Sequence, residues 1–208
     1  MKKGLFRLCM AVSLFPVVVN AQAFDNYYFG ISAGKAELDA NASSNHNDIK
    51  PEGFYDITID DSDTAFKIFG GAEINDNISL EAFYTNLGQY TVNADFTKQN
   101  ITANTDIRYD IESVGIDLVG SFPLSETFNI FGKIGMQYWY VDSIVDVSSN
   151  TSAYYIKHQS DLETGFDPTY GIGIAMNIHQ FSVRAEYEVY KIDEEDINMM
   201  SVGVAYHF

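Results

Sequence analysis

The sequence predicts an all-β protein, an eight-stranded antiparallel up-and-down transmembrane β-barrel. Three observations support this fold class. The first residues have the form of a secretory signal, the rest of the chain alternates apolar with polar or small residues, and the connections between the alternating stretches are short and long in turn. A length of 208 residues suits one domain of ordinary size.

The composition excludes several classes of protein. Hydrophobic residues make up 46% of the chain, which is too much for a disordered acidic tail. The mean hydropathy of −0.10 is too low for a bundle of membrane helices, each of which needs about 20 consecutive apolar residues. The formal charge of −17 argues against a nucleic-acid partner, and Cys9 as the only cysteine excludes a disulfide framework or a cysteine zinc site.

Residues 1–23 are predicted to be a signal peptide. Basic residues precede an apolar run at residues 8–19, and Ala21 and Ala23 then form an A-x-A cleavage motif. The apolar run is too short to span a bilayer as a helix. We therefore expect cleavage after Ala23 and a mature barrel domain of residues 24–208.

The first four strands are predicted from alternating stretches. These run from about Tyr27 to Leu38, from Thr64 to Ile74, from Ile78 to Gly88 and from about Glu112 to Phe122. In each, apolar residues recur at every second position, as in a strand with one apolar face. The apolar residues are Phe29, Ile31 and Ala33; Phe66, Ile68, Ala72 and Ile74; Ile78, Leu80, Ala82 and Tyr84; and Val114, Ile116, Leu118 and Phe122.

The last four strands follow the same pattern. They run from Thr127 to Val141, from Thr169 to Ile178, from Phe181 to Tyr190 and from Met200 to Phe208. Their apolar residues are Phe128, Ile130, Ile134 and Tyr138; Ile172, Ile174, Met176 and Ile178; Phe181, Val183, Ala185, Tyr187 and Val189; and Met200, Val202, Val204, Tyr206 and Phe208. No stretch after the signal has helical periodicity.

The connections between the strands alternate in length. Asn75–Asn77, Pro123–Glu126 and His179–Gln180 are predicted to be tight turns. Longer polar segments, which we expect to be loops, are residues 39–63, 89–111, 142–168 and 191–197. An up-and-down sheet places all of these loops at one end. We expect that end to face outward, with the tight turns and both termini in the periplasm.

The two strand faces distinguish a membrane barrel from a soluble one. Glycines are frequent opposite the apolar face, and small residues suit the narrow interior of an eight-stranded barrel. Aromatic residues gather near the strand ends, as expected where a membrane barrel meets the lipid headgroups. One group is Tyr27, Phe122, Phe128, Phe181, Tyr206 and Phe208, and the other is Tyr84, Tyr138, Tyr140 and Tyr187. A soluble sandwich or a lipocalin-like barrel is the alternative.

Several patches resemble the OmpA-type transmembrane domain, a family of small, porin-like outer-membrane barrels. The patches are FGGAEIN at residues 69–75, ISLE at 78–81, NLG at 86–88, VRAEY at 183–187 and YFG at 28–30. The resemblance implies the outer membrane of a Gram-negative cell. OmpA itself carries a peptidoglycan-binding domain, whereas this chain is expected to end at the barrel. The glutamate of the family's sixth strand has no clear counterpart here.

The C-terminal strand carries a further resemblance. Val202, Val204, Tyr206 and Phe208 resemble the terminal motif of outer-membrane barrels that the barrel assembly machinery recognises. This implies that the assembly machinery and periplasmic chaperones are partners during biogenesis. Outer-membrane lipids and lipopolysaccharide are the partners expected around the inserted barrel, and we expect a monomer.

Charged residues are predicted to point into the barrel. They are Lys67, Glu73, Glu81, Asp117, Lys133, Arg184, Glu186 and Glu188. Charges in a confined interior need partners, and the planar fork of Arg184 makes it the expected hub. The resemblance implies Glu81 as its partner in a gate-like ion pair, and Glu186 and Lys133 are further candidates. The alternative is that these charges only fill and order a polar interior.

No enzyme, cofactor or metal site is predicted. The sequence His158-Gln159-Ser160, with Asp161 or Glu163, resembles the H-x-S arrangement of lipid A deacylases, but it lies in an expected loop instead of on a lipid-facing strand. The acidic segments at residues 56–63 and 193–196 could bind divalent cations. They lack the EF-hand spacing, so we interpret them as solvated loops.

The sequence as a whole predicts a structural, surface-exposed outer-membrane barrel with acidic outer loops and a packed polar interior. The alternatives are an adhesin or host-interaction barrel, a narrow low-conductance channel and, least favoured, a lipid-modifying enzyme.

Overall fold

The computed structural model describes residues 26–39, 54–98, 101–149, 156–193 and 195–208. The predicted signal peptide, with Ala21 and Ala23, lies outside the described residues. All regular structure in the described part of the chain is β-strand. Within that part, no helix is long and apolar enough to span a membrane.

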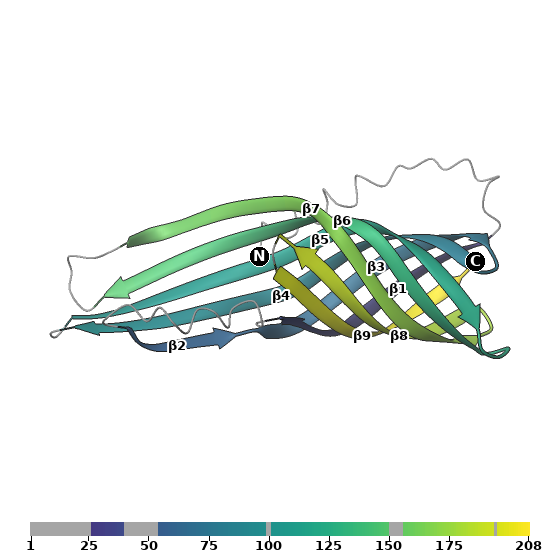
Figure 1. Ribbon diagram of the computed structural model, residues 1–208, viewed down its shortest axis with the longest axis horizontal. Helices are drawn as coiled ribbons and strands as arrows, with labels where there is room; N and C mark the ends of the chain where they lie inside the picture. The colour runs from purple at the N-terminus through teal and green to yellow at the C-terminus, as the bar shows by residue number, and fades with distance from the viewer. Residues whose placement is uncertain (1–25, 40–53, 99–100, 150–155, 194) are drawn as a thin grey trace.

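Eight strands form a closed antiparallel barrel (Figure 1). They are β1 (Tyr27–Leu38), β3 (Ser62–Asn75), β4 (Ile78–Lys98), β5 (Ile101–Pro123), β6 (Phe128–Ser149), β7 (Ile156–Ile178), β8 (Phe181–Ile192) and β9 (Glu195–His207). Neighbours in the chain pair with one another, and β1 pairs with both β3 and β9, which closes the ring. The predicted eight-stranded antiparallel barrel is therefore confirmed.

Four of the strands are much longer than the sequence predicted. The expected loops at residues 89–111 and 142–168 consist largely of paired strand, because β4 and β5 continue to Lys98 and Ile101 and β6 and β7 continue to Ser149 and Ile156. A further strand, β2 (Phe54–Asp60), lies in the expected loop at residues 39–63 and pairs with the outer part of β4. The expected loop at residues 191–197 is also largely paired strand, since β8 ends at Ile192 and β9 begins at Glu195.

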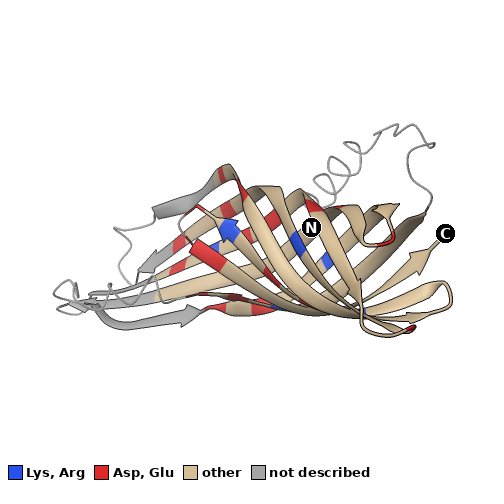
Figure 2. Cartoon of the chain, turned by 45° about the vertical axis from the view of Figure 1, so that its right-hand side comes forward, with Lys and Arg blue, Asp and Glu red and all other residues tan. Residues whose placement is uncertain are grey.

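These extensions form a sheet that projects beyond one end of the barrel. We call it the raised sheet, and it consists of β2 and residues 89–98, 101–111, 142–149 and 156–162. Figure 1 shows β4–β7 continuing past the ends of β8 and β9. Acidic residues are frequent where the barrel passes into this sheet (Figure 2). We call the opposite end, which carries the tight turns, the turn end.

The barrel wall has its apolar face outward, as predicted. Ile134, Ile172 and Met200 are each about two thirds exposed, at 65%, 67% and 65%, whereas the inward-facing Lys67 and Glu81 are 0% exposed. In water such a surface would be unstable, but in hydrocarbon it matches the surroundings while every strand pairs with two neighbours. The distribution is that of a membrane barrel and not of a soluble one.

Aromatic side chains gather toward both ends of this apolar face. At the turn end, the ring of Tyr206 lies 5.2 Å from that of Phe181 and 5.0 Å from that of Phe208. At the other end, the rings of Tyr138 and Tyr140 are 4.9 Å apart. Edge-to-face pairs of this kind stabilise each ring beyond its buried area.

Glycines on the two faces have different surroundings, which gives a test of the fold. A Cβ on the interior Gly34 would collide with the backbone carbonyl of Met200, whereas a Cβ on the lipid-facing Gly132 would have no neighbour nearer than 3.8 Å. We expect Gly34→Ala to cost about 1–3 kcal/mol of folding free energy by overpacking. Gly132→Ala is expected to be neutral or to stabilise by about 0.5–1 kcal/mol, because alanine loses less chain entropy in a strand. Urea unfolding in detergent micelles measures both, and a larger loss for Gly132→Ala would contradict the assignment of faces.

Candidate functional site

The candidate site is a cluster of charged side chains in the middle of the barrel. Its carboxylates are Glu81 on β4 and Glu186 and Glu188 on β8, and its cations are Lys67 on β3, Lys133 on β6 and Arg184 on β8. Arg184, Glu186 and Glu188 share one face because side chains two residues apart in a strand point the same way. We call these six residues the ion cluster.

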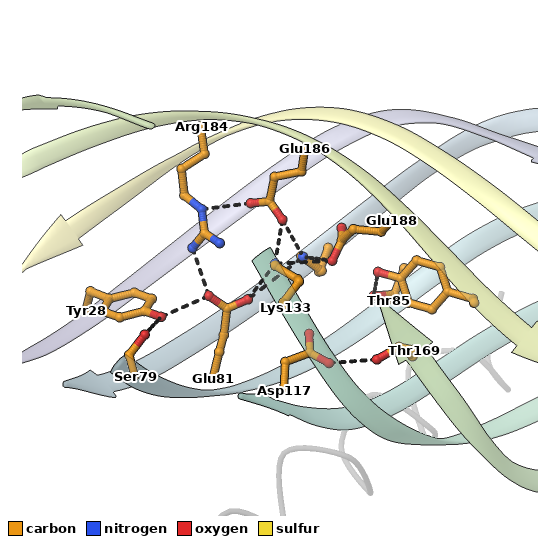
Figure 3. Close-up of polar contacts among 12 residues, drawn as sticks. Tyr28, Ser79, Glu81, Thr85, Asp117, Lys133, Thr169, Arg184, Glu186 and Glu188 are labelled. Carbon is orange, nitrogen blue, oxygen red and sulfur yellow. Dashed lines mark hydrogen bonds and ion pairs between the residues drawn. The ribbon is translucent and has the colours of Figure 1, made fainter. Parts of the chain in front are cut away.

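Arg184 lies at the end of the ion cluster nearer the turns. Its Nη1 donates a hydrogen bond of 2.8 Å to Glu81 Oε2, and its Nε lies 2.8 Å from Glu186 Oε1 (Figure 3). The guanidinium carbon lies 4.5 Å from the ring centre of Phe69 and 4.6 Å from that of Phe131. Contact with two aromatic rings suits a guanidinium, which is more weakly hydrated than an ammonium group.

The two lysines contact the carboxylates most extensively. Lys133 Nζ lies 3.0 Å from Glu81, 2.6 Å from Glu186 and 3.2 Å from Glu188. Lys67 Nζ lies 2.6 Å from Glu188, 3.1 Å from Glu186 and 3.9 Å from Glu81. The expected hub, Arg184, touches two carboxylates, whereas each lysine reaches three.

The ion cluster is almost fully removed from water, and its formal charges balance. The side chains are between 0% and 6% exposed, and three cations face three carboxylates. Burying charges costs several kcal/mol per ion, which close pairing can offset. Removing one charge therefore leaves an opposite charge buried without compensation.

Neutral polar side chains extend the ion cluster on both sides. Tyr28 Oη donates to Glu81 Oε2 at 3.0 Å and lies 3.2 Å from Ser79 Oγ. Farther from the turns, Thr169 Oγ1 donates to Asp117 Oδ1 at 2.6 Å, and Thr85 Oγ1 lies 3.2 Å from Tyr190 Oη. Figure 3 shows Tyr28 and Ser79 joined to the ion cluster, and the contacts of Asp117 with Thr169 and of Thr85 as separate pairs beside it.

The structure brings together all four residues named from the sequence for this site. Glu81, Arg184, Glu186 and Lys133 are mutual neighbours through the contacts above. Sequence reasoning placed Lys67 and Glu188 inside the barrel but did not assign either of them to the site. The stagger between strands decides which inward residues meet, and the alternation pattern alone does not give that stagger.

The candidate assembly residues lie on the lipid-facing side of the last strand. Val202, Val204 and Phe208 are exposed there, at 62%, 41% and 75%. The backbone N–H of Phe208 donates to Tyr27 O at 2.9 Å, and β9 pairs with β1 along its length. The terminal strand therefore closes the barrel, which is the position expected of an assembly signal.

The other sequence candidates form no site in the described residues. The side chains of His158, Ser160 and Asp161 lie outside them, and Glu163 is exposed. No group of three His, Cys, Asp or Glu side chains in the described part of the chain could hold a metal ion. Near the connection between β8 and β9, Lys191 of β8 donates from Nζ to Asp196 Oδ1 of β9 at 2.6 Å, and this hydrogen bond raises the pKa of Lys191.

Comparison with known proteins gives one family and several relatives. A family model described as the outer membrane protein beta-barrel domain matches residues 8–208. Outer membrane protein A of Shigella flexneri is 22% identical, over all of this chain and 56% of its own length, so the chain spans just over half of that relative.

Solved structures with the same architecture also match. The crystal structure of Neisserial surface protein A aligns with a TM-score of 0.52 at 14% identity, over 88% of this chain and 99% of that chain. The attachment invasion locus protein of Yersinia pestis, crystallised with the heparin analogue sucrose octasulfate, aligns with a TM-score of 0.49 at 19% identity, over 88% of this chain and 98% of that chain.

Proposed function

The chain belongs to the outer-membrane protein β-barrel family, and on that basis we propose that it acts at the bacterial cell surface as a non-catalytic, monomeric barrel. In this proposal the apolar outer face contacts outer-membrane lipids and lipopolysaccharide. The raised sheet faces the outside, and the turn end faces the periplasm. The terminal strand, with Tyr206 and Phe208, serves as the signal for the barrel assembly machinery and periplasmic chaperones.

The observation that carries this proposal is the raised sheet. Residues 89–98 of β4 pair with residues 101–110 of β5 without interruption, although β8 and β9 end near the barrel rim. A paired sheet holds its backbone in a fixed arrangement, which a free loop does not. It therefore offers a rigid surface beyond the membrane for contact with other molecules.

The charge of the raised sheet supports a position in water. Asp110 lies opposite Asp142 and Asp106 lies opposite Asp146 on the outward-facing side, with Arg108 2.7 Å from Asp146. This side continues the lipid-facing surface of the barrel, so its residues change from apolar to acidic along the same strands. Such a change is expected where a strand leaves hydrocarbon for water.

Contact with host surfaces is a second candidate function, and the same raised sheet favours it. A narrow channel is less favoured, because the ion cluster and the aromatic rings around Arg184 fill the interior. The lipid-modifying enzyme is not favoured by any side chain in the described ranges.

Cysteine labelling on intact cells tests the orientation. A bulky, membrane-impermeant maleimide is expected to label Thr91→Cys in the raised sheet, and to label Asp76→Cys at the turn end only after the outer membrane is permeabilised. Both positions are at least partly accessible, and Cys9 is the only native cysteine, so background is low. Labelling of Asp76→Cys, but not of Thr91→Cys, on intact cells would contradict the proposed orientation.

Shortening the raised sheet separates adhesion from a purely structural role. Deletion of residues 92–107 removes its central hairpin beyond the pair formed by Thr91 and Arg108. We expect the shortened protein to insert and to keep heat-modifiable gel migration, because the barrel wall is untouched. Loss of adherence to host cells would support the host-contact function, and unchanged adherence would rule it out for this hairpin.

A further inference from the structure

We infer that the interior of the barrel is a chamber that is open at the turn end and sealed at the raised-sheet end by an apolar plug. The inference goes beyond a surface role, because it states from which side water and small ions reach the ion cluster. Three features carry it: the side chains at the outer rim, their closure across β7, and a polar cavity at the opposite end.

Several inward-facing residues next to the raised sheet are apolar, in contrast to the charged middle of the barrel. They come from β4, β5, β6, β8 and β9 and pack together in one cluster. We call the following six residues the apolar plug: Leu87, Ile111, Trp139, Ile192, Ile197 and Met199. Leu87, Ile197 and Met199 are 0% exposed and the other three are 7% exposed, so the plug residues are shielded from solvent along these strands.

A polar pair closes the plug where it meets β7. Trp139 Nε1 donates to Asp167 Oδ2 at 2.7 Å, and the backbone N–H of Asp193 donates to the same oxygen at 3.1 Å. The indole ring also lies against Gly165, where a Cβ would collide with it. β7 therefore contributes a glycine and a hydrogen-bonded carboxylate that allow the tryptophan ring to cover this side of the rim.

The turn end has the opposite character. A polar cavity of about 110 Å³ lies there, and Ser121, Asn177, Ser182 and Arg184 are among its lining residues. His207 and Glu73, at its opening, have side chains that are 35% and 32% exposed. The cavity therefore lies between the solvent at the turn end and Arg184.

The difference between the two ends determines from which side water and small ions reach the ion cluster. Water and ions are disfavoured in a narrow apolar constriction, which acts as a barrier by dewetting. Solutes small enough for the cavity reach Arg184 from the turn end and stop at the ion cluster. Ser113 and Thr85, which lie between the ion cluster and the plug, are closed from both sides and are 0% exposed. The statement that the open end faces the periplasm rests on the orientation proposed above. The seal at the raised-sheet end does not depend on that orientation.

Thiol reactivity in the detergent-solubilised barrel, where both ends meet solvent, tests the seal. Ser113 and Ser121 both face inward on β5, on the two sides of the ion cluster, and Ser113 Oγ has no hydrogen-bond partner that a cysteine would lose. With Cys9 replaced by serine, we expect a small charged methanethiosulfonate to modify Ser121→Cys at least about ten-fold faster than Ser113→Cys, because access controls the reaction. Equal rates in the folded barrel would overturn the inference.

Truncation of the plug gives an independent second arm. Leu87→Ala combined with Ile197→Ala is expected to raise the rate at Ser113→Cys about ten-fold, since both deleted side chains are fully buried in the plug. The matched control is Val119→Ala, at a buried residue that lines the cavity on the turn side of the ion cluster, and it is expected to leave that rate unchanged. Faster modification of Ser113→Cys with Val119→Ala but not with the plug variant would contradict a seal at the raised-sheet end. Heat-modifiable gel migration shows whether each variant folds. If the plug variant does not fold, the comparison of Ser113→Cys with Ser121→Cys still tests the seal.

Discussion

Replacing Lys133 with methionine is expected to destabilise the barrel by about 3–5 kcal/mol, because it leaves a buried carboxylate without compensation. Lys133 contacts Glu81, Glu186 and Glu188, and its side chain is 1% exposed. Methionine keeps the approximate length of the side chain, so the loss of folding free energy reflects removal of the charge more than a change in volume. Equilibrium unfolding in urea, in detergent micelles or liposomes, measures the effect.

Charge balance also predicts the behaviour of a double variant. Glu81→Gln alone leaves an excess cation and is expected to be strongly destabilising as well. Combined with Lys133→Met, it leaves two cations facing two carboxylates, and the loss is expected to fall well below the sum of the two single losses. Lys35→Met is the matched control, because Lys35 is exposed on β1 and its loss should change stability by no more than about 0.5 kcal/mol. Additive losses would show that the ion cluster does not act as a balanced unit.

Replacing Trp139 with alanine is expected to cost about 3–5 kcal/mol, the usual range for deleting a large buried aromatic side chain. Trp139 is 7% exposed, packs in the apolar plug and donates to Asp167. The substitution leaves a cavity at the outer rim and removes one donor from a carboxylate that also holds the connection after β8. Urea unfolding measures the loss of folding free energy. It is followed by circular dichroism, because the variant lacks Trp139, the single tryptophan of the chain.

Tyr138 provides the control for this prediction. It precedes Trp139 in β6 but faces the lipid, where it is 39% exposed and contacts Tyr140. Tyr138→Ala is expected to cost less than half as much as Trp139→Ala, because its ring is only partly buried within the protein. A larger loss of stability for Tyr138→Ala than for Trp139→Ala would mean that the apolar plug contributes less to stability than the lipid-facing aromatic residues do.

The barrel wall could be predicted from sequence because its two faces meet different surroundings. Hydrocarbon outside and a narrow interior inside force residues such as Ile172 and Gly173 to alternate. The raised sheet meets water on its outward side, so the strict alternation disappears and residues 89–111 resemble a loop. Their β-forming content, which includes Tyr90, Val92 and Ile107, was the signal that could have revealed the longer strands.

The interior was predictable only in part. The inward direction of Lys67 followed from its place in the pattern, but its contacts with Glu186 and Glu188 depend on the stagger of strands far apart in the sequence. The apolar plug was missed for a different reason. Ile111 and Ile197 lie in segments that the sequence analysis assigned to loops, so a packed polar interior was expected.

The change from lipid to water along β6 tests the central claim most directly. Ile130, Ile134, Tyr138, Asp142 and Asp146 follow one another at four-residue intervals on the outward face of this strand. Spin labels placed singly at these positions in the reconstituted barrel report contact with dissolved oxygen, which partitions into lipid, and with a nickel chelate, which stays in water. We predict oxygen contact at the first two positions, an interface at Tyr138, and nickel contact at the last two. Nickel contact at Ile130 and Ile134 would contradict a barrel that spans the membrane with its apolar face outward.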